Sequence, residues 1–308
     1  MRNMLKLVVA AALLTMGGCA MDGDGRADAM PKQGDAVMAD REMQGLPEPV
    51  APRPGSSLGM LEILAMPHRS EANRARDVYR NPQQTLVFFD VLPHQTVIEV
   101  TPGGGWYTEV LAPYLRTNGM LIAQVFDPTS GSNERAREYY TRSNAEYRAK
   151  LAAAPYLYDR VRVIESPINA PVLGAPASVD RVVTFRNVHN WTAAGTDAAM
   201  FKAFFDVLKP HGVLGVEEHR AAAGTDPAVG AKSGYIAESY VIKLATDAGF
   251  ELTERSEINA NPKDTRDYKK GVWTLPPVLR VPEGEDKAKY LAIGESDRMT
   301  LKFVKPAR

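Results

Sequence analysis

The chain has 308 residues, of which 44% are hydrophobic and 24% are charged, and this apolar content is enough for one large core or two small ones. Its 37 basic residues balance its 37 acidic residues, and no run of basic residues alternates with aromatic ones. We therefore expect no binding of nucleic acid, because such binding needs a positive field.

The first residues have the layout of a secretory signal peptide. Arg2 and Lys6 precede an apolar run, LVVAAALLTM, which is too short to span a bilayer and leads through two glycines to Cys19. This arrangement resembles the lipobox of bacterial lipoproteins, although Met16 replaces the usual leucine. The resemblance implies a signal peptide over residues 1–18 and a lipidated N-terminal cysteine. The alternative is an ordinary cleavage site with a cysteine nearby by chance.

Ala20 follows the cysteine, and the absence of aspartate at this position is similar to lipoproteins that are sorted to the outer membrane. We therefore expect a lipoprotein of the cell envelope that is attached to the membrane by acyl chains and faces the periplasm. Residues 19–56 predict a disordered tether, because they are rich in Gly, Pro, Asp and Ala and lack aromatic residues. One folded domain is expected over residues 57–308.

The folded domain alternates strand and helix patterns after a helical extension over residues 57–95. Strands are expected at 97–101, 120–126, 161–164, 179–185 and 213–217, and helices at 133–153, 196–208 and 235–248. This alternation predicts a parallel sheet with crossovers on both faces. Two later apolar segments, 250–258 and 299–304, show no helical pattern between them and could pair as an antiparallel edge. The expected fold is therefore α/β, with a doubly wound, mostly parallel Rossmann-like sheet and an antiparallel C-terminal edge strand.

The segment VIEVTPGGGWYTEVLAPYL, residues 97–115, reads as a strand, a turn with three consecutive glycines and a helix. In a parallel sheet such a turn lies at the carboxyl ends of the strands, where ligands bind. Glycines let the backbone approach a ligand closely, and the next helix directs free N–H groups to the same place. The sequence therefore predicts a ligand-binding turn, with a purely structural turn as the alternative.

These residues resemble the first motif of class I S-adenosylmethionine-dependent methyltransferases. Glu99 lies near the end of the first strand and Gly103 and Gly105 follow at alternate positions, whereas Thr101 stands where the family's first glycine is usual. Asp127 matches the acidic residue after the second strand, which in that family binds the ribose hydroxyls of the cofactor. The resemblance implies S-adenosyl-L-methionine as the cofactor. The cofactor site that it implies consists of Glu99, Thr101, Gly103, Gly104, Gly105 and Asp127. Asn187, which follows the expected fourth strand, is expected to line the same pocket through its amide.

Further motifs follow in the order of the family, namely VDRVVTFRNVHNW, FFDVLKPHGVLGVEEH and KLATDAGFEL. The resemblance covers about residues 81–308. It extends to a group of uncharacterised predicted methyltransferases through PGGGWYTEVLAPYL and ESDRMTLKFVKP, and it implies no substrate. A nicotinamide dinucleotide is the alternative ligand, because it would use nearly the same spacing. Pro102 in the turn, Glu99 before it and the antiparallel ending argue against a dinucleotide.

His189 follows the expected fourth strand, where an imidazole could remove a proton from a hydroxyl or amine as methyl is transferred. The alternative is that His189 caps the strand or packs against Trp191. Glu218 and His219, with Glu217, end the fifth strand and are the second catalytic candidates, because a carboxylate can orient a neighbouring histidine as a base. These groups could also bind a metal or face water, and we assign no metal site.

Two further segments are candidates for contact with a substrate. Residues 259–297 form a long connection, which predicts a lid in which Trp273 covers the substrate. One expected helix before the sheet carries several arginines with acidic residues between them, which predicts a solvated face with ion pairs or, alternatively, an anion site. These arginines are Arg69, Arg74, Arg76 and Arg80.

The sequence thus predicts a methyltransferase that acts on a small-molecule acceptor. The competing hypothesis is a non-catalytic envelope lipoprotein that retains the fold as a ligand-binding or interaction module. Location favours this competitor, because the cofactor is made in the cytoplasm and the signal would export the domain. The fold alone does not decide between the two hypotheses.

Overall fold

The computed structural model describes residues 58–307. The expected signal peptide over residues 1–18, the lipidated Cys19 and the tether over residues 19–56 lie outside the described residues. Within residues 58–307, no helix is both long enough and apolar enough to cross a membrane.

Seven strands in this described part form one sheet with the order β3-β2-β1-β4-β5-β7-β6. The strands are β1 (Thr96–Val100), β2 (Met120–Phe126), β3 (Arg162–Ser166), β4 (Val179–Phe185), β5 (Leu208–His219), β6 (Glu251–Ser256) and β7 (Arg298–Val304). The first five strands pair in parallel, and β7 lies antiparallel between β5 and β6. This topology confirms the expected α/β fold with a doubly wound, mostly parallel sheet and an antiparallel pair at its C-terminal edge. The strand order reverses between β1 and β4, which is where ligands bind in doubly wound sheets.

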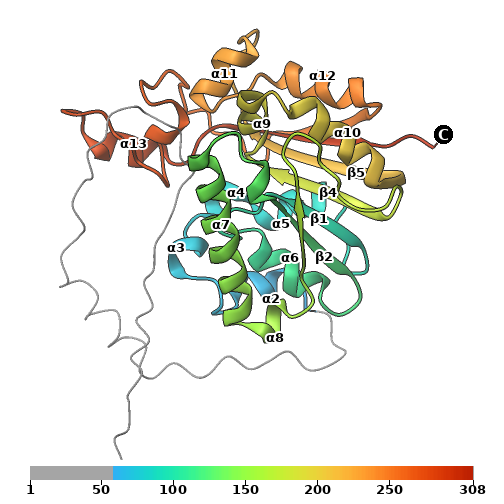
Figure 1. Ribbon diagram of the computed structural model, residues 1–308. Coiled ribbons are helices and arrows are strands. Elements are labelled where there is room, and N and C mark those ends of the chain that lie inside the picture. The colour runs from blue at the N-terminus through green and yellow to red at the C-terminus, as the bar shows by residue number, and fades with distance from the viewer. Residues whose placement is uncertain (1–57, 308) are drawn as a thin grey trace, which may run out of the picture. The chain divides into compact units, whose positions relative to one another are not determined.

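Helices cover both faces of the sheet (Figure 1). Those before β1 are α2 (Met60–Ala65), α3 (Glu71–Arg74), α4 (Asp77–Arg80) and α5 (Pro82–Phe88). Those between β1 and β6 are α6 (Thr108–Leu115), the 3-10 helix η1 (Pro128–Ser130), α7 (Glu134–Ala153), α8 (Pro155–Tyr158), α9 (Val188–Ala194), α10 (Asp197–Val207), α11 (Pro227–Ser233) and α12 (Glu238–Ala248). The 3-10 helix η2 (Gly271–Thr274) and α13 (Lys287–Ile293) follow β6.

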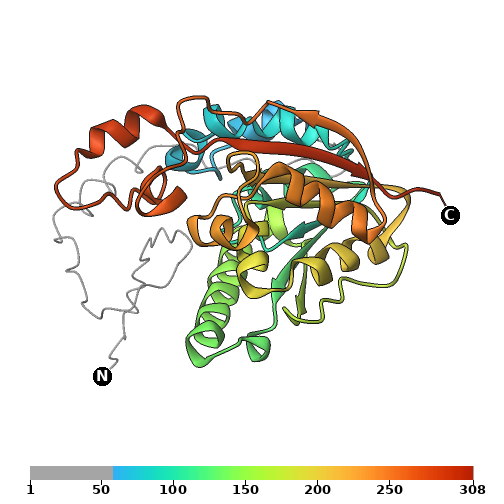
Figure 2. The same ribbon diagram turned by 90° about the horizontal axis from the view of Figure 1, so that it is seen from above.

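Each face of the sheet has its own apolar core. Val97 of β1 packs with Leu111 of α6 on one face, whereas the next residue, Ile98, packs with Phe204 of α10 on the other. The two faces alternate because successive side chains of a strand point in opposite directions. Figure 2 shows the result, with the cyan N-terminal helices and the orange α12 on opposite sides of the red strand β7. Strand β1 is therefore buried on both faces and holds the glycine turn at a fixed place.

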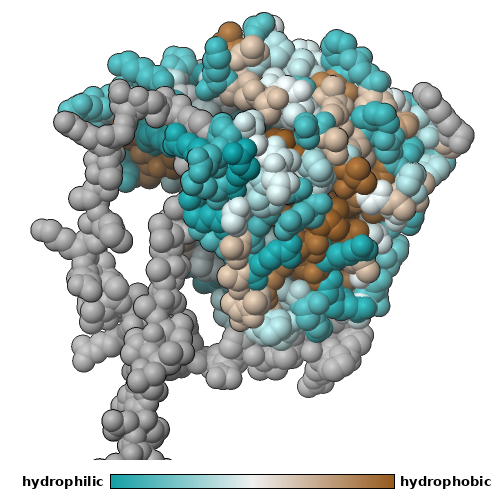
Figure 3. Space-filling model, viewed as in Figure 1, coloured by the Kyte–Doolittle hydropathy of each residue, from teal (hydrophilic) through white to brown (hydrophobic). Residues whose placement is uncertain are grey.

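Helix α7 is the long crossover helix after β2. It begins after Asn133, whose side chain accepts a hydrogen bond from the backbone N–H of Ala136 at 2.9 Å. Its buried residues are Asn144 and Tyr147, and the surface around its amino-terminal half is mostly hydrophilic (Figure 3). The helix therefore contacts the sheet along one narrow side, and this side also faces the glycine turn.

The N-terminal extension is tied to the segment that precedes β7. Asn81 Nδ2 donates a hydrogen bond of 2.7 Å to the carbonyl of Ile258, and Arg298 Nη2 donates one of 2.9 Å to the carbonyl of Tyr79. Because β7 is antiparallel, Arg298 at its start pairs with His219 at the carboxyl end of β5. Side chains from both ends of the domain are thereby brought to the edge of the sheet where ligands bind.

Two expectations for the flanking segments are wrong. Helix α13 lies between β6 and β7, where the apolar pattern indicates no helix, and Asp286 caps it by accepting from the N–H of Ala288 at 2.8 Å. The N-terminal arginines do not share one helix, because α3 and α4 are separate and Arg69 precedes both. Arg69 and Arg80 are buried, so a solvated face does not describe them.

Candidate functional site

The glycine turn leaves β1 through a run of left-handed residues. Thr101, Gly103 and Gly105 have φ angles of +48°, +57° and +73°. A Cβ placed on Gly103 or Gly104 would meet nothing within 4 Å, so the backbone of these two residues is open to a ligand. A Cβ on Gly105 would lie 3.1 Å from the Tyr147 ring, so this glycine is required by packing against α7. The turn therefore has an open side and a packed side.

Thr101 stands where a glycine was expected, and its backbone shows why. A β-branched residue with φ near +48° is an outlier, and such a conformation costs on the order of 1–3 kcal/mol. The backbone N–H of Thr101 donates to the carbonyl of Gln124 at 2.8 Å, and its carbonyl accepts from Asn187 Nδ2 at 3.4 Å. These neighbours hold Thr101 in a conformation that glycine adopts more readily.

Glu99 lies under the turn and not at its open side. Its carboxylate is buried and accepts a 2.6 Å hydrogen bond from the Thr108 hydroxyl, which also lies 3.0 Å from the hydroxyl of Tyr147. Burial raises the pKa of Glu99 to about 7, against the opposite effect of the Thr108 bond. Glu99 thus fixes the first turn of α6, and we assign it no contact with a ligand.

Sequence reasoning missed the contribution of α7 to this turn. Lys150 Nζ donates to the carbonyl of Gly104 at 2.8 Å and lies 2.6 Å from a carboxylate oxygen of Glu109. Lys150 is one of several cations on a polar helix, and no local pattern marks it. Only the packing of α7 against α6 brings it to the turn.

Asp127 stands directly after β2 and is half-buried. Its Oδ1 atom caps η1 by accepting from the backbone N–H and the hydroxyl of Thr129, both at 2.8 Å. Within residues 58–307, its Oδ2 atom has no hydrogen-bond donor. One carboxylate oxygen is therefore free to accept from a ligand hydroxyl, which is the predicted role of this residue.

Asn187 connects the fourth strand to the glycine turn. Its Nδ2 atom donates to the carbonyl of Val100 at 3.0 Å and lies 3.2 Å from the hydroxyl of Thr184. The amide nitrogen is thus committed to the end of β1, and only the amide oxygen is left for a ligand. The structure places Asn187 beside the predicted cofactor turn as a positioning residue.

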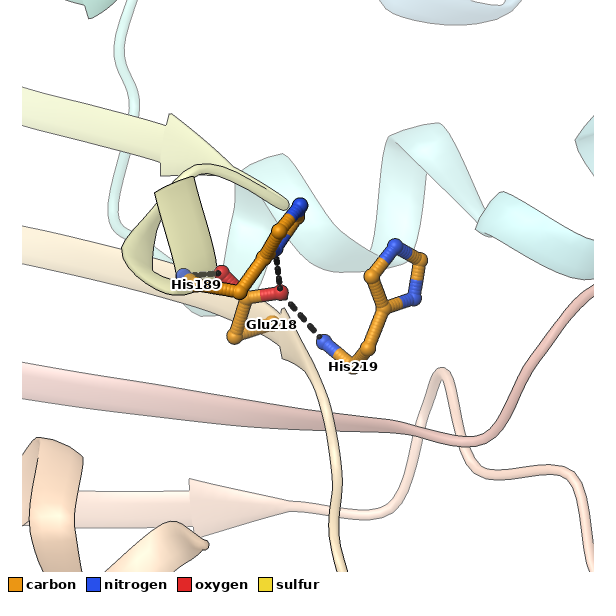
Figure 4. Close-up of side chains that lie close together, drawn as sticks. All are labelled: His189, Glu218 and His219. Carbon is orange, nitrogen blue, oxygen red and sulfur yellow. Dashed lines mark hydrogen bonds and ion pairs between the residues drawn. The ribbon is translucent and has the colours of Figure 1, made fainter. Parts of the chain in front are cut away.

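His189 and Glu218 form a buried pair at the ends of β4 and β5 (Figure 4). His189 Nδ1 lies 3.0 Å from Glu218 Oε1, and the backbone N–H of His189 donates to Oε2 at 3.3 Å. Beside a carboxylate, Nδ1 carries the proton, so Nε2 is left as a proton acceptor. Trp191, the other partner considered for His189, packs against Phe204 in the core. The structure therefore joins the two predicted catalytic sets in one pair.

His219 lies next to this pair, with its ring centroid 5.5 Å from that of His189. Its Nδ1 atom is 2.6 Å from the Ser296 hydroxyl, and its backbone N–H donates to Glu218 Oε1 at 2.8 Å. Burial, with the nearby charges of His189 and Arg186, holds the pKa of His219 well below its usual range. His219 is therefore neutral near pH 7 and can form hydrogen bonds without adding charge.

The same three residues lie close enough together to hold a metal ion. His189, Glu218 and His219 offer one ligand atom each, and these atoms lie within 4.8 Å of one another. Both carboxylate oxygens of Glu218, however, already accept from N–H groups. The positive charge of Arg186 and Arg298 near His219 also opposes a cation. This environment suits proton transfer better than metal binding.

Trp273 lies close to the pair of His189 and Glu218, as the lid hypothesis requires. Its ring is half-buried in η2, and its centroid is 6.1 Å from that of His189 in an edge-on arrangement. Gly234 at the end of α11 supports it, because a Cβ there would lie 3.3 Å from the indole. Whether the segment over residues 259–297 opens and closes remains a prediction.

Glu217 belongs to a different cluster from Glu218, although the two are neighbours in β5. It lies 2.6 Å from Arg186 Nη1 and 2.9 Å from Arg298 Nη1. Glu295 accepts from Arg76 and Arg80 in the same region, at 2.7 and 2.9 Å. The four arginines are Arg76, Arg80, Arg186 and Arg298. We call these four residues the arginine cluster. Because Glu217 and Glu218 are neighbours in β5, the arginine cluster lies beside the pair of His189 and Glu218.

No family model matches the sequence, and no curated protein matches it. Among solved structures, this chain is similar to a S-adenosylmethionine-dependent methyltransferase from Aquifex aeolicus, with 15% identity and a TM-score of 0.49 over 80% of this chain and 99% of that chain. It is also similar to the glycopeptide N-methyltransferase MtfA, with 14% identity and a TM-score of 0.47 over 77% of this chain and 100% of that one. A TehB-like S-adenosylmethionine-dependent methyltransferase from Corynebacterium glutamicum has 14% identity and a TM-score of 0.42, over 76% of this chain and 95% of its own. At these identities the similarity concerns the fold.

Proposed function

We propose that this protein is a S-adenosylmethionine-dependent methyltransferase that acts on an oxygen or nitrogen of a small-molecule acceptor. The observation that carries the proposal is an open glycine turn after β1 beside a carboxylate-oriented histidine after β4. Strands β1 and β4 are parallel neighbours at the reversal of strand order, so both features belong to one edge of the sheet.

The open side of the turn fits the cofactor. The backbone of Gly103 and Gly104 can approach it closely, and the free Oδ2 atom of Asp127 can accept from its ribose hydroxyls. When bound, S-adenosylmethionine supplies an activated methyl group on a sulfonium. Glu99, Lys150 and Asn187 hold the turn in place from behind.

The pair of His189 and Glu218 supplies the acid–base chemistry. His189 Nε2 removes the proton from the acceptor's hydroxyl or amine group, and Glu218 stabilises the imidazolium that forms. The neutral His219 orients the acceptor by a hydrogen bond, and Trp273 excludes water from the same place. With donor and acceptor aligned, the remaining work of the protein is positioning.

The experiment is calorimetric titration of the purified full-length protein with S-adenosylmethionine and S-adenosylhomocysteine. Gly104→Val is the test variant, because its side chain would enter the open space without backbone strain. Gly59→Val is the matched control, since Gly59 has an ordinary φ of −67° and caps α2. We expect saturable binding to the wild type and the control, and a loss of at least about a hundredfold in Gly104→Val. A folded wild type that gives no heat with either ligand contradicts the proposal.

The location in the cell envelope is a separate proposal that rests on the sequence around Cys19. Fractionation of cells that make the wild type or Cys19→Ser tests it. The wild type is expected in the outer-membrane fraction with label from palmitate, and Cys19→Ser is expected without label. If both forms remain in the cytoplasm, the export hypothesis is wrong. An exported protein that binds the cofactor but methylates no acceptor would instead support the non-catalytic hypothesis.

A further inference from the structure

The arginine cluster contains more positive than negative charge. Glu217 and Glu295 are the carboxylates that bind its four guanidinium groups, namely those of Arg76, Arg80, Arg186 and Arg298. Burial alone would raise the pKa of both carboxyl groups, but the arginines hold it below the usual range, so both are ionised. Every arginine contacts a carboxylate, but four guanidinium groups share two carboxylates, so the cluster has two more positive than negative charges.

One of these arginines is fully occupied by the protein. Arg298 donates from Nη1 to Glu217 at 2.9 Å, from Nη2 to the Tyr79 carbonyl at 2.9 Å and from Nε to the Ser296 carbonyl at 3.2 Å. Its side chain is only 1% exposed. Arg298 thus has a structural role and joins the start of β7 to the N-terminal extension.

The other three arginines have unused donors. Arg76 and Arg80 each donate only from Nε, to the two oxygens of Glu295, and Arg186 donates only from Nη1, to Glu217. Within residues 58–307, the remaining guanidinium nitrogens of these three side chains have no hydrogen-bond acceptor. The side chains of Arg76 and Arg186 are 23% and 17% exposed, so a ligand can reach them.

Arg80 is held at a high electrostatic cost. Its side chain is 5% exposed and its guanidinium lies 4.8 Å from the centroid of Trp106, the residue that follows the glycine turn. Burial and the charge of Arg186 lower the pKa of Arg80 to about 9. The Trp106 ring also contacts Arg69, whose guanidinium lies 5.1 Å from the ring centroid, so the ring offsets only part of the cost of burying Arg80. A bound anion would remove the imbalance, since a guanidinium matches a carboxylate or phosphate in shape and charge.

The cluster borders the proposed catalytic pair. Arg186 follows β4 directly, has a φ of +60° and stands three positions before His189. Glu217 and Glu218 are consecutive in β5, so they point to opposite faces and serve the arginine cluster and His189 respectively. His219 connects the two groups, because its ring centroid lies 5.5 Å from that of His189 and the charges of Arg80, Arg186 and Arg298 help to lower its pKa. A molecule that bridges the two groups would have its negative end at the arginines and its reactive atom near His189.

Resting on the proposed function, we infer that the methyl acceptor is a small anion whose carboxylate or phosphate group is bound by Arg76, Arg80 and Arg186. A purely structural role would be fulfilled by the contacts of Glu295 and Arg298 that tie the extension to β7. It would not require the unused donors or the excess positive charge. The cluster therefore assigns a charge to the acceptor, which the glycine turn cannot do.

The experiment titrates the full-length protein with sodium phosphate and, separately, sodium acetate at constant ionic strength, and follows binding by calorimetry. Arg76→Gln is the test variant and Arg74→Gln the matched control, because both arginines are half-buried in the same extension and, among the described residues, the Arg74 guanidinium binds only the Arg69 carbonyl. Arg76→Lys keeps the charge. We expect saturable binding to the wild type, a loss of about tenfold or more in Arg76→Gln, a smaller loss in Arg76→Lys, which keeps the charge but not the planar guanidinium, and little change in Arg74→Gln. The stronger of the two anions identifies the acceptor group.

Two outcomes would overturn the inference, namely no saturable binding of either anion, or equal affinity in Arg76→Gln and Arg74→Gln with both variants folded by circular dichroism. Titration of the same variants with S-adenosylhomocysteine separates this inference from the proposed function. Anion binding without S-adenosylhomocysteine binding contradicts the proposed function and leaves the anion site standing. The reverse result contradicts the anion site alone.

Discussion

Thr108 donates a 2.6 Å hydrogen bond to the buried carboxylate of Glu99, which links the strand before the glycine turn to the helix after it. Burial raises the pKa of Glu99 from 4.5 to about 7 in the folded protein. The protonated form is therefore the one that the fold prefers. Its stabilising effect is complete below the unfolded-state pKa and is lost as the pH rises through the folded-state pKa.

The first prediction is that Glu99→Gln removes this pH dependence. An amide oxygen at position 99 can still accept from Thr108 but carries no charge when buried. We expect the variant to match the wild type near pH 4.5 and to exceed its free energy of unfolding by about 2–3 kcal/mol at pH 8. Urea unfolding at several pH values measures the free energy of unfolding of both proteins. The contributions of the other titrating groups cancel in the difference between the variant and the wild type. A difference that does not change between pH 4.5 and 8 contradicts the burial argument.

The second prediction concerns the strained turn residue. Thr101→Gly should raise the free energy of unfolding by about 1 kcal/mol, because glycine adopts a φ of +48° without a steric clash. Thr253→Gly in the exposed strand β6 is the control and should lower it, since glycine weakens an ordinary strand. Thermal unfolding of both variants checks the signs. If the two substitutions destabilise the protein alike, Thr101 is not strained.

Much of the fold could be predicted from the sequence because local periodicity determines it. Strands β2 (Met120–Phe126) and β4 (Val179–Phe185) have the bounds that their apolar runs indicate, and the pairing of β6 with β7 is confirmed. Helix α13 was missed because it carries no apolar stripe, and only its cap at Asp286 marks it. The pattern of apolar residues therefore predicts what is buried in the sheet and predicts little beyond it.

The site was less accessible to sequence reasoning, because partner choice depends on tertiary contacts. Glu217 and Glu218 are adjacent in the sequence, yet one binds arginines and the other binds His189. Arg80 and Glu295 are 215 positions apart and meet only because β7 is antiparallel. The alternating charges of the N-terminal extension are typical of a solvated helix. In the folded protein, however, Arg69 and Arg80 are buried.

The third prediction tests the buried ion pair of Arg298 and Glu217. Arg298→Met should lower the free energy of unfolding by about 3 kcal/mol, because it removes the buried hydrogen bonds that Arg298 donates to Glu217 and to the carbonyls of Tyr79 and Ser296. Arg148→Met is the matched control in the exposed pair with Glu165, where the side chains are 50% and 41% exposed, and should cost less than about 1 kcal/mol. Urea unfolding of both variants provides the comparison. Equal effects would mean that the buried pair contributes no more than a surface pair.

The last prediction separates catalysis by His189 from a structural role. His189→Ala should lower turnover by about 10²–10⁴-fold, since His189 supplies the imidazole that pairs with Glu218 among residues 58–307. Its affinity for S-adenosylhomocysteine should stay within a few-fold of the wild type. Among the described residues, no hydrogen bond joins the His189 imidazole to the glycine turn. The measurement is the rate of S-adenosylhomocysteine formation with an acceptor that the wild type methylates, alongside calorimetric titration.

The exposed His211 in β5 provides the control for this prediction, and His211→Ala should leave both quantities unchanged. Glu218→Gln should show an intermediate loss of turnover, because the amide still fixes the ring but no longer stabilises the imidazolium. Parallel loss of stability, cofactor affinity and turnover in His189→Ala would instead assign the pair to the core. Selective loss of turnover would place the proton transfer at Nε2 of His189. This atom would then act beside the arginine cluster that is proposed to bind the negative group of the acceptor, because Glu217 and Glu218 are neighbours in β5.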